Sequence, residues 1–119
     1  MKVHVRNLDN ISIVDGTGDV DLYSSPLLRD ALLAEIKADG PSVLVNMSGV
    51  TYIDSSGIAT LVEGLQLSRQ TQTRFGLFGL RQNARSVLEL ARLNIVFAIF
   101  EDEAEALEKI GSVQPFSGV

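Results

Sequence analysis

Hydrophobic and polar residues follow two different periods along this chain, and the periods predict strands and helices. A period of two opens the chain, with apolar residues at Val3, Val5, Ile11 and Ile13. It predicts two strands within the first fifteen residues, joined at residues 8–10 as a hairpin. Short uninterrupted apolar runs, typical of strands buried on both faces of a sheet, follow at residues 43–45, 75–78 and 96–100.

Between these runs the apolar residues recur every three or four positions, as they do along one face of a helix. The four stripes are Leu28, Ala31, Leu32 and Ile36; Ile58, Leu61, Val62 and Leu65; Ala84, Val87, Leu88 and Ala91; and Ala104, Leu107 and Ile110. The first helix is expected to begin near residue 26, with Ser25 as N-cap and Pro26 in the first turn. Residues 39–41, Asp-Gly-Pro, are expected to end it.

Strands that alternate with helices predict an α/β fold, in which crossover helices connect the strands of a largely parallel sheet. The expected order is ββαβαβαβα, with about four helices and a mixed, mostly parallel sheet of four to five strands. The second helix should end at about Gln72, with Gly64 as a weak point. We expect a single domain over residues 1–119, with its core at about 8–110 and a frayed tail at 112–119.

Composition removes several classes of function. The chain has 119 residues, no cysteine and one histidine, His4, so it lacks the residues for disulfides or a thiolate metal site and has little basis for a transition-metal cluster. No apolar run approaches the roughly 20 residues of a membrane-spanning helix, and no secretion signal opens the chain. We therefore expect a cytoplasmic protein without membrane insertion. A net charge of −5 argues against nucleic acid as a partner.

The charges are unevenly spread along the second half of the chain. Basic residues gather first, at Arg69, Arg74, Arg81, Arg85 and Arg92, and acidic ones follow, at Glu101, Asp102, Glu103, Glu105 and Glu108. Arg81, Arg85 and Arg92 recur at roughly helical spacing opposite the apolar stripe, which predicts a shared solvent face. Solvation explains such faces, and a patch that contacts a partner is the alternative.

The segment YIDSSGIAT, residues 52–60, places a carboxylate, two hydroxyls and a glycine at the start of the second expected helix. Asp54, Ser55 and Ser56 are all favoured there, because their oxygens accept the free N–H groups of the first turn. A serine nucleophile would need a base and a group that orients the base. His4, on a predicted strand, is a poor candidate, and the segment is not the G-x-S-x-G elbow of hydrolases. The residues alone therefore favour a helix cap.

Two further carboxylates precede the first helix. Asp19 and Asp21 lie at the end of a predicted strand, and their loop could meet Asp54 at one end of the sheet. Three acidic groups at one rim could bind Mg²⁺, but phosphoryl-transfer sites also require a phosphate-binding element. The G-x-x-x-x-G-K-[S/T] loop is absent, so no metal or other cofactor is expected.

Three segments, taken in their order and spacing, resemble the STAS domain family: GDVDLYSSPLLRDAL, VLVNMSGVTYIDSSGIATLV and LRQNARSVLELARLNIVF. More narrowly, they resemble the free-standing bacterial anti-sigma factor antagonists. The most specific element is the apolar-Asp-Ser-Ser/Thr-Gly-apolar segment, followed by G-[D/E]-apolar-D at residues 18–21. Asn46 and Ala59 depart from the family, which often has aspartate and glycine there.

The resemblance implies a partner switch without catalytic activity of its own. It implies that a partner, both anti-sigma factor and serine kinase, phosphorylates Ser55, with Ser56 as second choice. The unphosphorylated antagonist would bind this partner and free a sigma factor, the phosphorylated form would let go, and a separate serine phosphatase would restore it. The binding surface would comprise Asp19, Asp21, Asp54, Ser55, Ser56 and Gly57. Gly57 is expected to let a partner approach the backbone closely.

The same resemblance leaves other roles open. In transporter-associated proteins the domain docks onto the ATPase of ABC-type lipid transporters, and in stress-signalling assemblies it packs with copies of itself. Nucleotide binding by the domain itself has weak precedent in the family and no phosphate loop in this chain. A helix start does suit a phosphate, because its free N–H groups and the helix dipole favour an anion.

Overall fold

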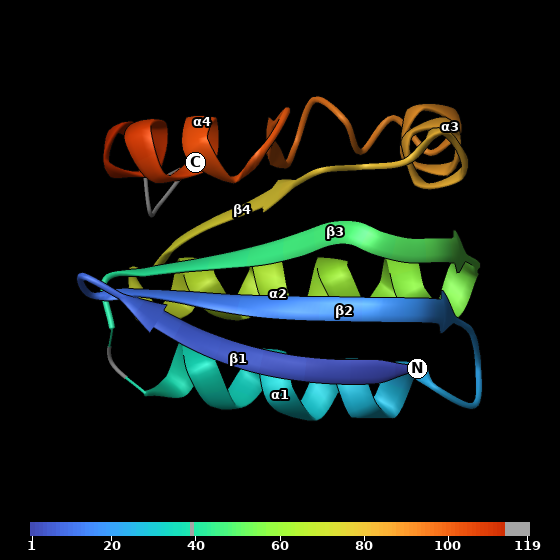
Figure 1. Cartoon of the computed structure of the whole chain (residues 1–119), viewed down its shortest axis with the longest axis horizontal. Coiled ribbons are helices and arrows are strands. Elements are labelled where there is room, and N and C mark those ends of the chain that lie inside the picture. The colour runs from blue at the N-terminus through green and yellow to red at the C-terminus, as the bar shows by residue number, and fades with distance from the viewer. Residues whose placement is uncertain (39, 114–119) are drawn as a thin grey trace.

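Five strands form one sheet, and helices lie against both of its faces (Figure 1). The computed structural model describes residues 1–38 and 40–113. Its elements are β1 (Lys2–Leu8), β2 (Ile11–Val20), α1 (Ser25–Lys37), β3 (Ser42–Ile53), α2 (Ser55–Thr71), β4 (Arg74–Phe78), α3 (Gln82–Leu90), β5 (Ala98–Phe100), α4 (Glu103–Lys109) and a short 3-10 helix, Ile110–Ser112. The predicted α/β class and the predicted order of elements are confirmed.

The strands lie in the order β1-β2-β3-β4-β5. β1 is antiparallel to β2, and the other three neighbouring pairs are parallel. The predicted hairpin is therefore confirmed. Asp9 and Asn10 form its turn with φ of 47° and 69°, the left-handed conformation that a two-residue hairpin turn requires and that these two residue types tolerate.

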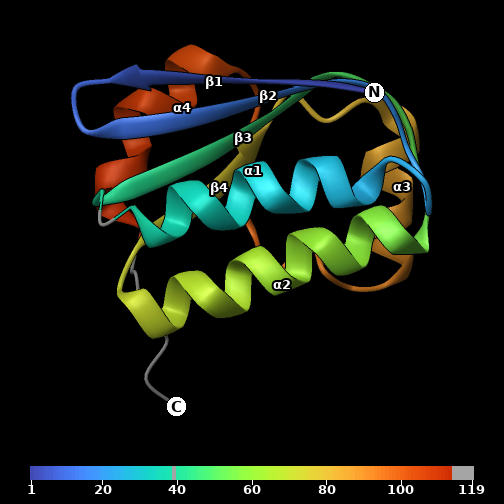
Figure 2. The same ribbon diagram turned by 90° about the horizontal axis from the view of Figure 1, so that it is seen from below.

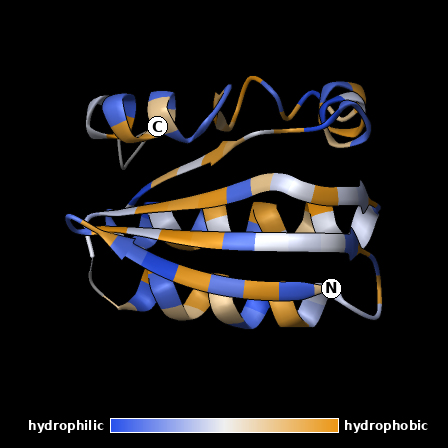
Figure 3. Ribbon diagram, in the orientation of Figure 1, coloured by the Kyte–Doolittle hydropathy of each residue, from blue (hydrophilic) through white to orange (hydrophobic). Residues whose placement is uncertain are grey.

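Two apolar clusters hold the layers together. Figure 2 shows α1 and α2 side by side on one face of the sheet, where fully buried Leu28, Leu32 and Leu61 pack against the central strands. On the other face, Ala106 and Ile110 pack over Ile13, Leu44, Phe78 and Phe100. Figure 3 shows apolar residues on the strands beneath both layers. Burial on both faces explains the uninterrupted apolar runs in the sequence.

Several predicted boundaries are wrong by a residue or two, and β3 runs eight residues past its predicted apolar run, to Ile53. Ser24, not Ser25, is the N-cap residue of α1, and its side chain does not cap the helix. The hydroxyl of Ser24 instead donates to the carbonyl of Asp19 and accepts from the N–H of Asp21. β5 is shorter than the predicted strand, because the N–H groups of Val96 and Phe97 are used in a turn with the carbonyl of Leu93.

Gly64, predicted as a weak point of α2, is a contact point between α2 and α1. It is buried, and a Cβ on it would lie 2.7 Å from Cδ2 of Leu32 on α1. The glycine therefore lets the two helices approach each other closely. Residue 39 of the predicted helix end and residues 114–119 of the predicted tail lie outside the described residues.

A chain of polar contacts crosses the sheet face that carries α4. Arg6 on β1 donates to both carboxylate oxygens of Asp15, at 2.6 and 2.9 Å, and to Glu103 at the start of α4, at 2.6 Å. Asn46 on β3 donates to Asp15 at 2.8 Å and accepts from the N–H of Ser48 at 3.0 Å. Burial raises the pKa of Asp15, but the hydrogen bonds from Arg6 and Asn46 outweigh burial and lower it below its usual value.

In the part of the chain that the structure describes, no helix combines the length and the apolar character that a membrane crossing needs.

Candidate functional site

The predicted site residues meet where β2 and β3 end. Val20 and Ile53 are paired in register, and the N–H of Asp54 donates to the carbonyl of Val20 at 3.1 Å. Neighbouring parallel strands end at the same edge of a sheet, so the loop after β2 and the start of α2 lie side by side. This end of the sheet is at the right in Figure 1.

Asp54 caps α2, as predicted. Its backbone is extended, and its Oδ1 accepts hydrogen bonds from the N–H groups of Ser56 at 2.8 Å and Gly57 at 3.3 Å. These are two of the N–H groups that a helix cannot satisfy within its first turn. The cap fixes the backbone on both sides of Ser55.

The carboxylates of Asp21 and Asp19 each accept hydrogen bonds from neighbouring residues. Asp21 accepts hydrogen bonds from the N–H groups of Ser24 and Tyr23 and from the Ser24 hydroxyl. These bonds lower the pKa of Asp21, with those from Ser24 acting most strongly. Asp19 accepts from the hydroxyl of Thr51 at 2.6 Å. Within residues 1–38 and 40–113, no three His, Asp or Glu side chains stand together in a way that could hold a metal ion.

The two serines differ in accessibility. Ser55, the first residue of α2, is exposed, whereas Ser56 is half-buried. Neither hydroxyl forms a hydrogen bond to any residue that the structure describes, so no base is positioned to activate them. His4 lies on β1, paired in register with Asp15. The arrangement offers an accessible hydroxyl at a helix start, not the base-activated nucleophile of a hydrolase.

Gly57 has a different role from the expected one. It is buried, and a Cβ on it would lie 2.4 Å from Cγ1 of Ile53 and 2.8 Å from Cγ1 of Val20. The space that the missing side chain leaves is therefore filled from inside the protein, not by a partner. Gly57 allows α2 to begin directly against the ends of β2 and β3.

Large apolar side chains around this end of the sheet were missed by the sequence reasoning. Leu22 is 67% exposed and Tyr23 is 90% exposed in the loop after β2, and Tyr52 near the end of β3 is 46% exposed. Tyr52 is paired in register with Asp19. Exposed apolar patches rimmed by polar residues mark interaction sites, and these three side chains lie at the end of the sheet that also carries Asp19 and Asp54. The signal in the sequence was the pair Leu22-Tyr23 in a loop, where folding does not require them.

The three arginines do not share one helix face, contrary to the prediction. Arg81 precedes α3, and its Nε donates to the carbonyl of Ser48 at 2.8 Å. Arg85 lies on α3, 3.9 Å from the Glu101 carboxylate. Arg92 follows α3 in a turn, with a left-handed φ of 58°.

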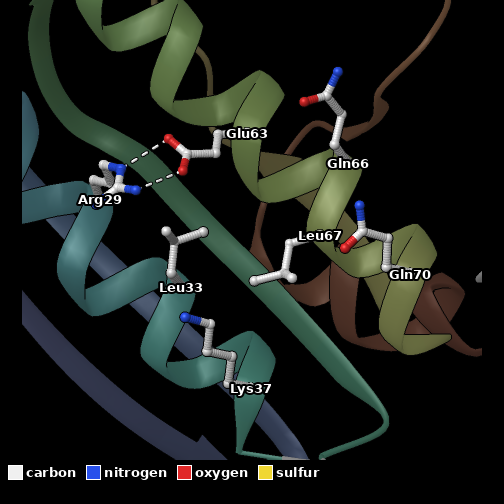
Figure 4. A pocket seen from close by; sticks show the side chains of 7 residues that line it. All are labelled: Arg29, Leu33, Lys37, Glu63, Gln66, Leu67 and Gln70. Atoms are coloured by element: carbon white, nitrogen blue, oxygen red, sulfur yellow. Dashed lines mark hydrogen bonds and ion pairs between the residues drawn. The ribbon is translucent and has the colours of Figure 1, made fainter.

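A hollow of about 240 Å³ lies away from this site, between α1 and α2 (Figure 4). Arg29 on α1 makes two hydrogen bonds across it to Glu63 on α2, at 2.8 and 2.7 Å. Arg29 lowers the pKa of Glu63. The paired charges of Arg29 and Glu63 join the two helices across the groove, which supports a role in holding α1 and α2 together.

Comparisons with known proteins identify the family. The STAS domain family matches residues 2–106. An anti-sigma-B factor antagonist of Listeria monocytogenes is 28% identical over 105 residues, which cover 88% of this chain and 91% of the relative.

An anti-sigma factor antagonist of Mycobacterium paratuberculosis shares the fold with a TM-score of 0.85 and 22% identity, over 92% of this chain and 93% of that one. The phosphorylated form of the Bacillus cell fate determinant SpoIIAA shares it with a TM-score of 0.72 and 15% identity, over 92% and 99% of the two chains. The chain described here belongs to the STAS domain family.

Proposed function

We propose that this protein is an anti-sigma factor antagonist that works as a partner switch, with Ser55 as its phosphoacceptor. The observation that carries the proposal is the exposed Ser55 directly after the capping Asp54, at the start of α2. The relative from Listeria, named an anti-sigma-B factor antagonist, supports the class of partner. The phosphorylated SpoIIAA structure supports phosphorylation as a state that this fold accommodates.

In the unphosphorylated state the partner binds what we call the switch rim. The rim consists of the loop after β2, the end of β3 and the start of α2: Asp19, Asp21, Leu22, Tyr23, Tyr52, Asp54, Ser55 and Ser56. Its exposed tyrosines supply contact area with little loss of side-chain freedom, and water is excluded around them. Hydrogen bonds from neighbouring residues orient the carboxylates of the rim. Their negative charge requires a complementary, positively charged surface on the partner. The partner is an anti-sigma factor with serine-kinase activity.

Phosphorylation then reverses binding through charge. The kinase transfers the γ-phosphoryl group of ATP to the Ser55 oxygen, while the hydroxyl proton passes to a base and ADP leaves. The phosphate adds about 1.5 to 2 negative charges at pH 7, beside Asp54 and on the same rim as Asp19 and Asp21. The positive end of the α2 dipole offsets part of this repulsion within the protein. A docked partner meets the charge and bulk of the phosphate at the interface, where the helix dipole does not compensate for them. The partner therefore dissociates.

This chain supplies the acceptor and the binding surface, and its partners supply the chemistry. A separate serine phosphatase hydrolyses the phosphoserine and returns the protein to its binding state. The role is therefore regulatory rather than enzymatic.

Phosphosite mapping tests the proposal directly. The protein is isolated from its own host in growth and in stress, and mass spectrometry measures the phosphate occupancy of each serine. We expect phosphate on Ser55 with an occupancy that changes with condition, and its loss in Ser55→Ala but not in Ser56→Ala. Unmodified Ser55 and Ser56 under every condition would overturn the switch and favour the docking subunit of an ABC-type lipid transporter.

A further inference from the structure

β3 continues well past the end of its neighbour β4. The pairing of β3 with β4 ends at Asn46, opposite Phe78, whereas β2 accompanies β3 to Ile53. Among the strands in residues 1–38 and 40–113, none therefore lies beside Met47 to Ile53 of β3 on the β4 side. Backbone N–H and C=O groups on an open strand edge need other partners. This open stretch leads directly into Asp54 and Ser55.

Side chains at the start of α3 take the place of the missing strand. Asn83, in the first turn of α3, accepts a hydrogen bond on its Oδ1 from the N–H of Ile53 at 2.9 Å. Arg81, the N-cap residue of α3, donates to the carbonyl of Ser48 at 2.8 Å. Figure 1 shows α3 beside the far end of β3, beyond the point where β4 diverges from it. The last residue of β3 is thus anchored by α3.

The segment around Ser55 is held from two further directions. The N–H of Asp54 donates to the carbonyl of Val20 on β2, and the Asp54 carboxylate binds the N–H groups of Ser56 and Gly57 on α2. β2 and α2 thus fix the residues after Ile53, while Asn83 fixes Ile53 itself. The exposed Ser55 hydroxyl is carried on a backbone that is bound on both sides.

We propose that Asn83 is a positioning residue of the switch: its side-chain carbonyl fixes the exit of β3 and, through the backbone, the direction in which Ser55 meets its partner. The inference rests on the proposed function of Ser55 and adds the element that sets its geometry. Asn83 acts through Ile53, without touching the phosphorylated group. When its carbonyl is removed, the N–H of Ile53 loses its partner and the segment from Ile53 to Ser55 gains freedom that the kinase must then remove on binding.

Three variants separate positioning from general stability. Asn83→Ala removes the acceptor, and Asn83→Asp keeps an acceptor oxygen at the same place. Gln82→Ala is the matched control, because the Gln82 side chain is exposed and donates to Ser86 within α3 itself. Each purified variant is labelled with ¹⁵N for NMR. Each is also phosphorylated with ATP in an extract of the host, at low and at saturating concentration of the variant.

In Asn83→Ala we expect faster hydrogen exchange at the Ile53 amide and shifted signals confined to residues 53–56, with the β1–β2 hairpin unchanged. The rate of Ser55 phosphorylation at low concentration of the variant should fall roughly tenfold, the scale of one lost hydrogen bond. The rate at saturating concentration should change less, because the kinase removes the added freedom on binding. Asn83→Asp and Gln82→Ala should stay within about twofold of the wild-type rate, since neither removes the acceptor.

Two results would overturn the inference: unchanged signals at residues 53–56 in Asn83→Ala, or a loss of rate that appears equally in Gln82→Ala. A reduced rate accompanied by signal changes across the whole protein would assign Asn83 a purely structural role. Failure of the proposed function looks different, because wild-type Ser55 would then acquire no phosphate. The amide signals of residues 53–56 would in that case still decide whether Asn83 sets the geometry of the segment.

Discussion

Within the segment from Asp54 to Gly57, each residue meets a different environment because a helix turns by about 100° per residue. Asp54 binds the N–H groups of the first turn, Ser55 is exposed, Ser56 is half-buried and Gly57 is buried against the strands. A kinase reaches an exposed hydroxyl without deforming the helix start, which is why Ser55 ranks ahead of Ser56 as the phosphoacceptor. Four adjacent residues thereby combine a helix cap, the proposed phosphoacceptor and a packing contact.

Gly57→Ala tests the packing contact. The added methyl group would lie 2.4 Å from Cγ1 of Ile53, and Ile53 is only 1% exposed, so the start of α2 must shift. We expect the free energy of unfolding to fall by about 1–3 kcal/mol, the usual cost of overpacking a core, as measured by urea denaturation. Ser55→Ala, an exposed neighbour, should change it by no more than about 0.5 kcal/mol. Equal stability of the two variants would show that α2 begins independently of β2 and β3.

Among the elements, β1 and α4 are linked although they lie near opposite ends of the sequence. Arg6 on β1 binds Asp15 on β2 and Glu103 at the start of α4 with the same guanidinium group. The Asp15 side chain is only 20% exposed, so solvent screens this contact less than it would screen a surface pair. The link fastens α4 over the sheet in addition to its apolar contacts.

The contact between Arg6 and Asp15 makes the free energy of unfolding depend on pH. The pKa of Asp15 is lower in the folded protein than in the unfolded chain, so its contribution is present above about pH 4 and is lost as the pH falls through the folded value. Asp15→Asn should lower the free energy of unfolding at pH 7 by about 1–2 kcal/mol. The difference from wild type should shrink as the pH falls below about 4, because the stabilisation by the charged carboxylate is lost as the group becomes protonated. Urea denaturation at several pH values measures it.

Glu108→Gln removes the same charge from an exposed position on α4 and serves as the control. Its effect should be small at every pH. A difference between Asp15→Asn and wild type that stays constant from pH 7 to 2.5 would contradict the role given to the Asp15 carboxylate.

The order of elements could be predicted from the sequence. The spacing of apolar residues shows which positions are buried, and in this protein the buried positions follow that local spacing. The full length of β3 does not: Ser48, Gly49 and Thr51 interrupt the apolar pattern, and β2 holds that stretch by pairing between segments distant in sequence. The role of Asn83 is equally invisible, because its partner is a backbone N–H group 30 residues away. The cap at Asp54 was predictable, since capping depends on adjacent residues.

For the whole molecule, the proposed switch rim lies at one end of the sheet, and we expect this position to determine how phosphorylation would act. The Cα atoms extend 28 × 27 × 26 Å, and α4 with its apolar cluster packs on a different part of the sheet from the rim. The Ser55 side chain is not part of the main apolar cluster beneath α1 and α2. We therefore expect a charge added at Ser55 to leave the layers of the fold in place.

Ser55→Asp tests this separation of surface from core. Phosphorylation takes the net charge from −5 to about −7, and the aspartate reproduces part of that change at the same residue. We expect the ¹H–¹⁵N spectrum of Ser55→Asp to differ from wild type only at the rim and the first turn of α2. Ser55→Asn, of nearly equal size but neutral, separates charge from bulk. If charge is the cause of release, the anti-sigma factor that wild type binds should be lost by the Asp variant and retained by the Asn variant. Shifts throughout α1 and β1 would instead mean that the switch works by rearranging the fold.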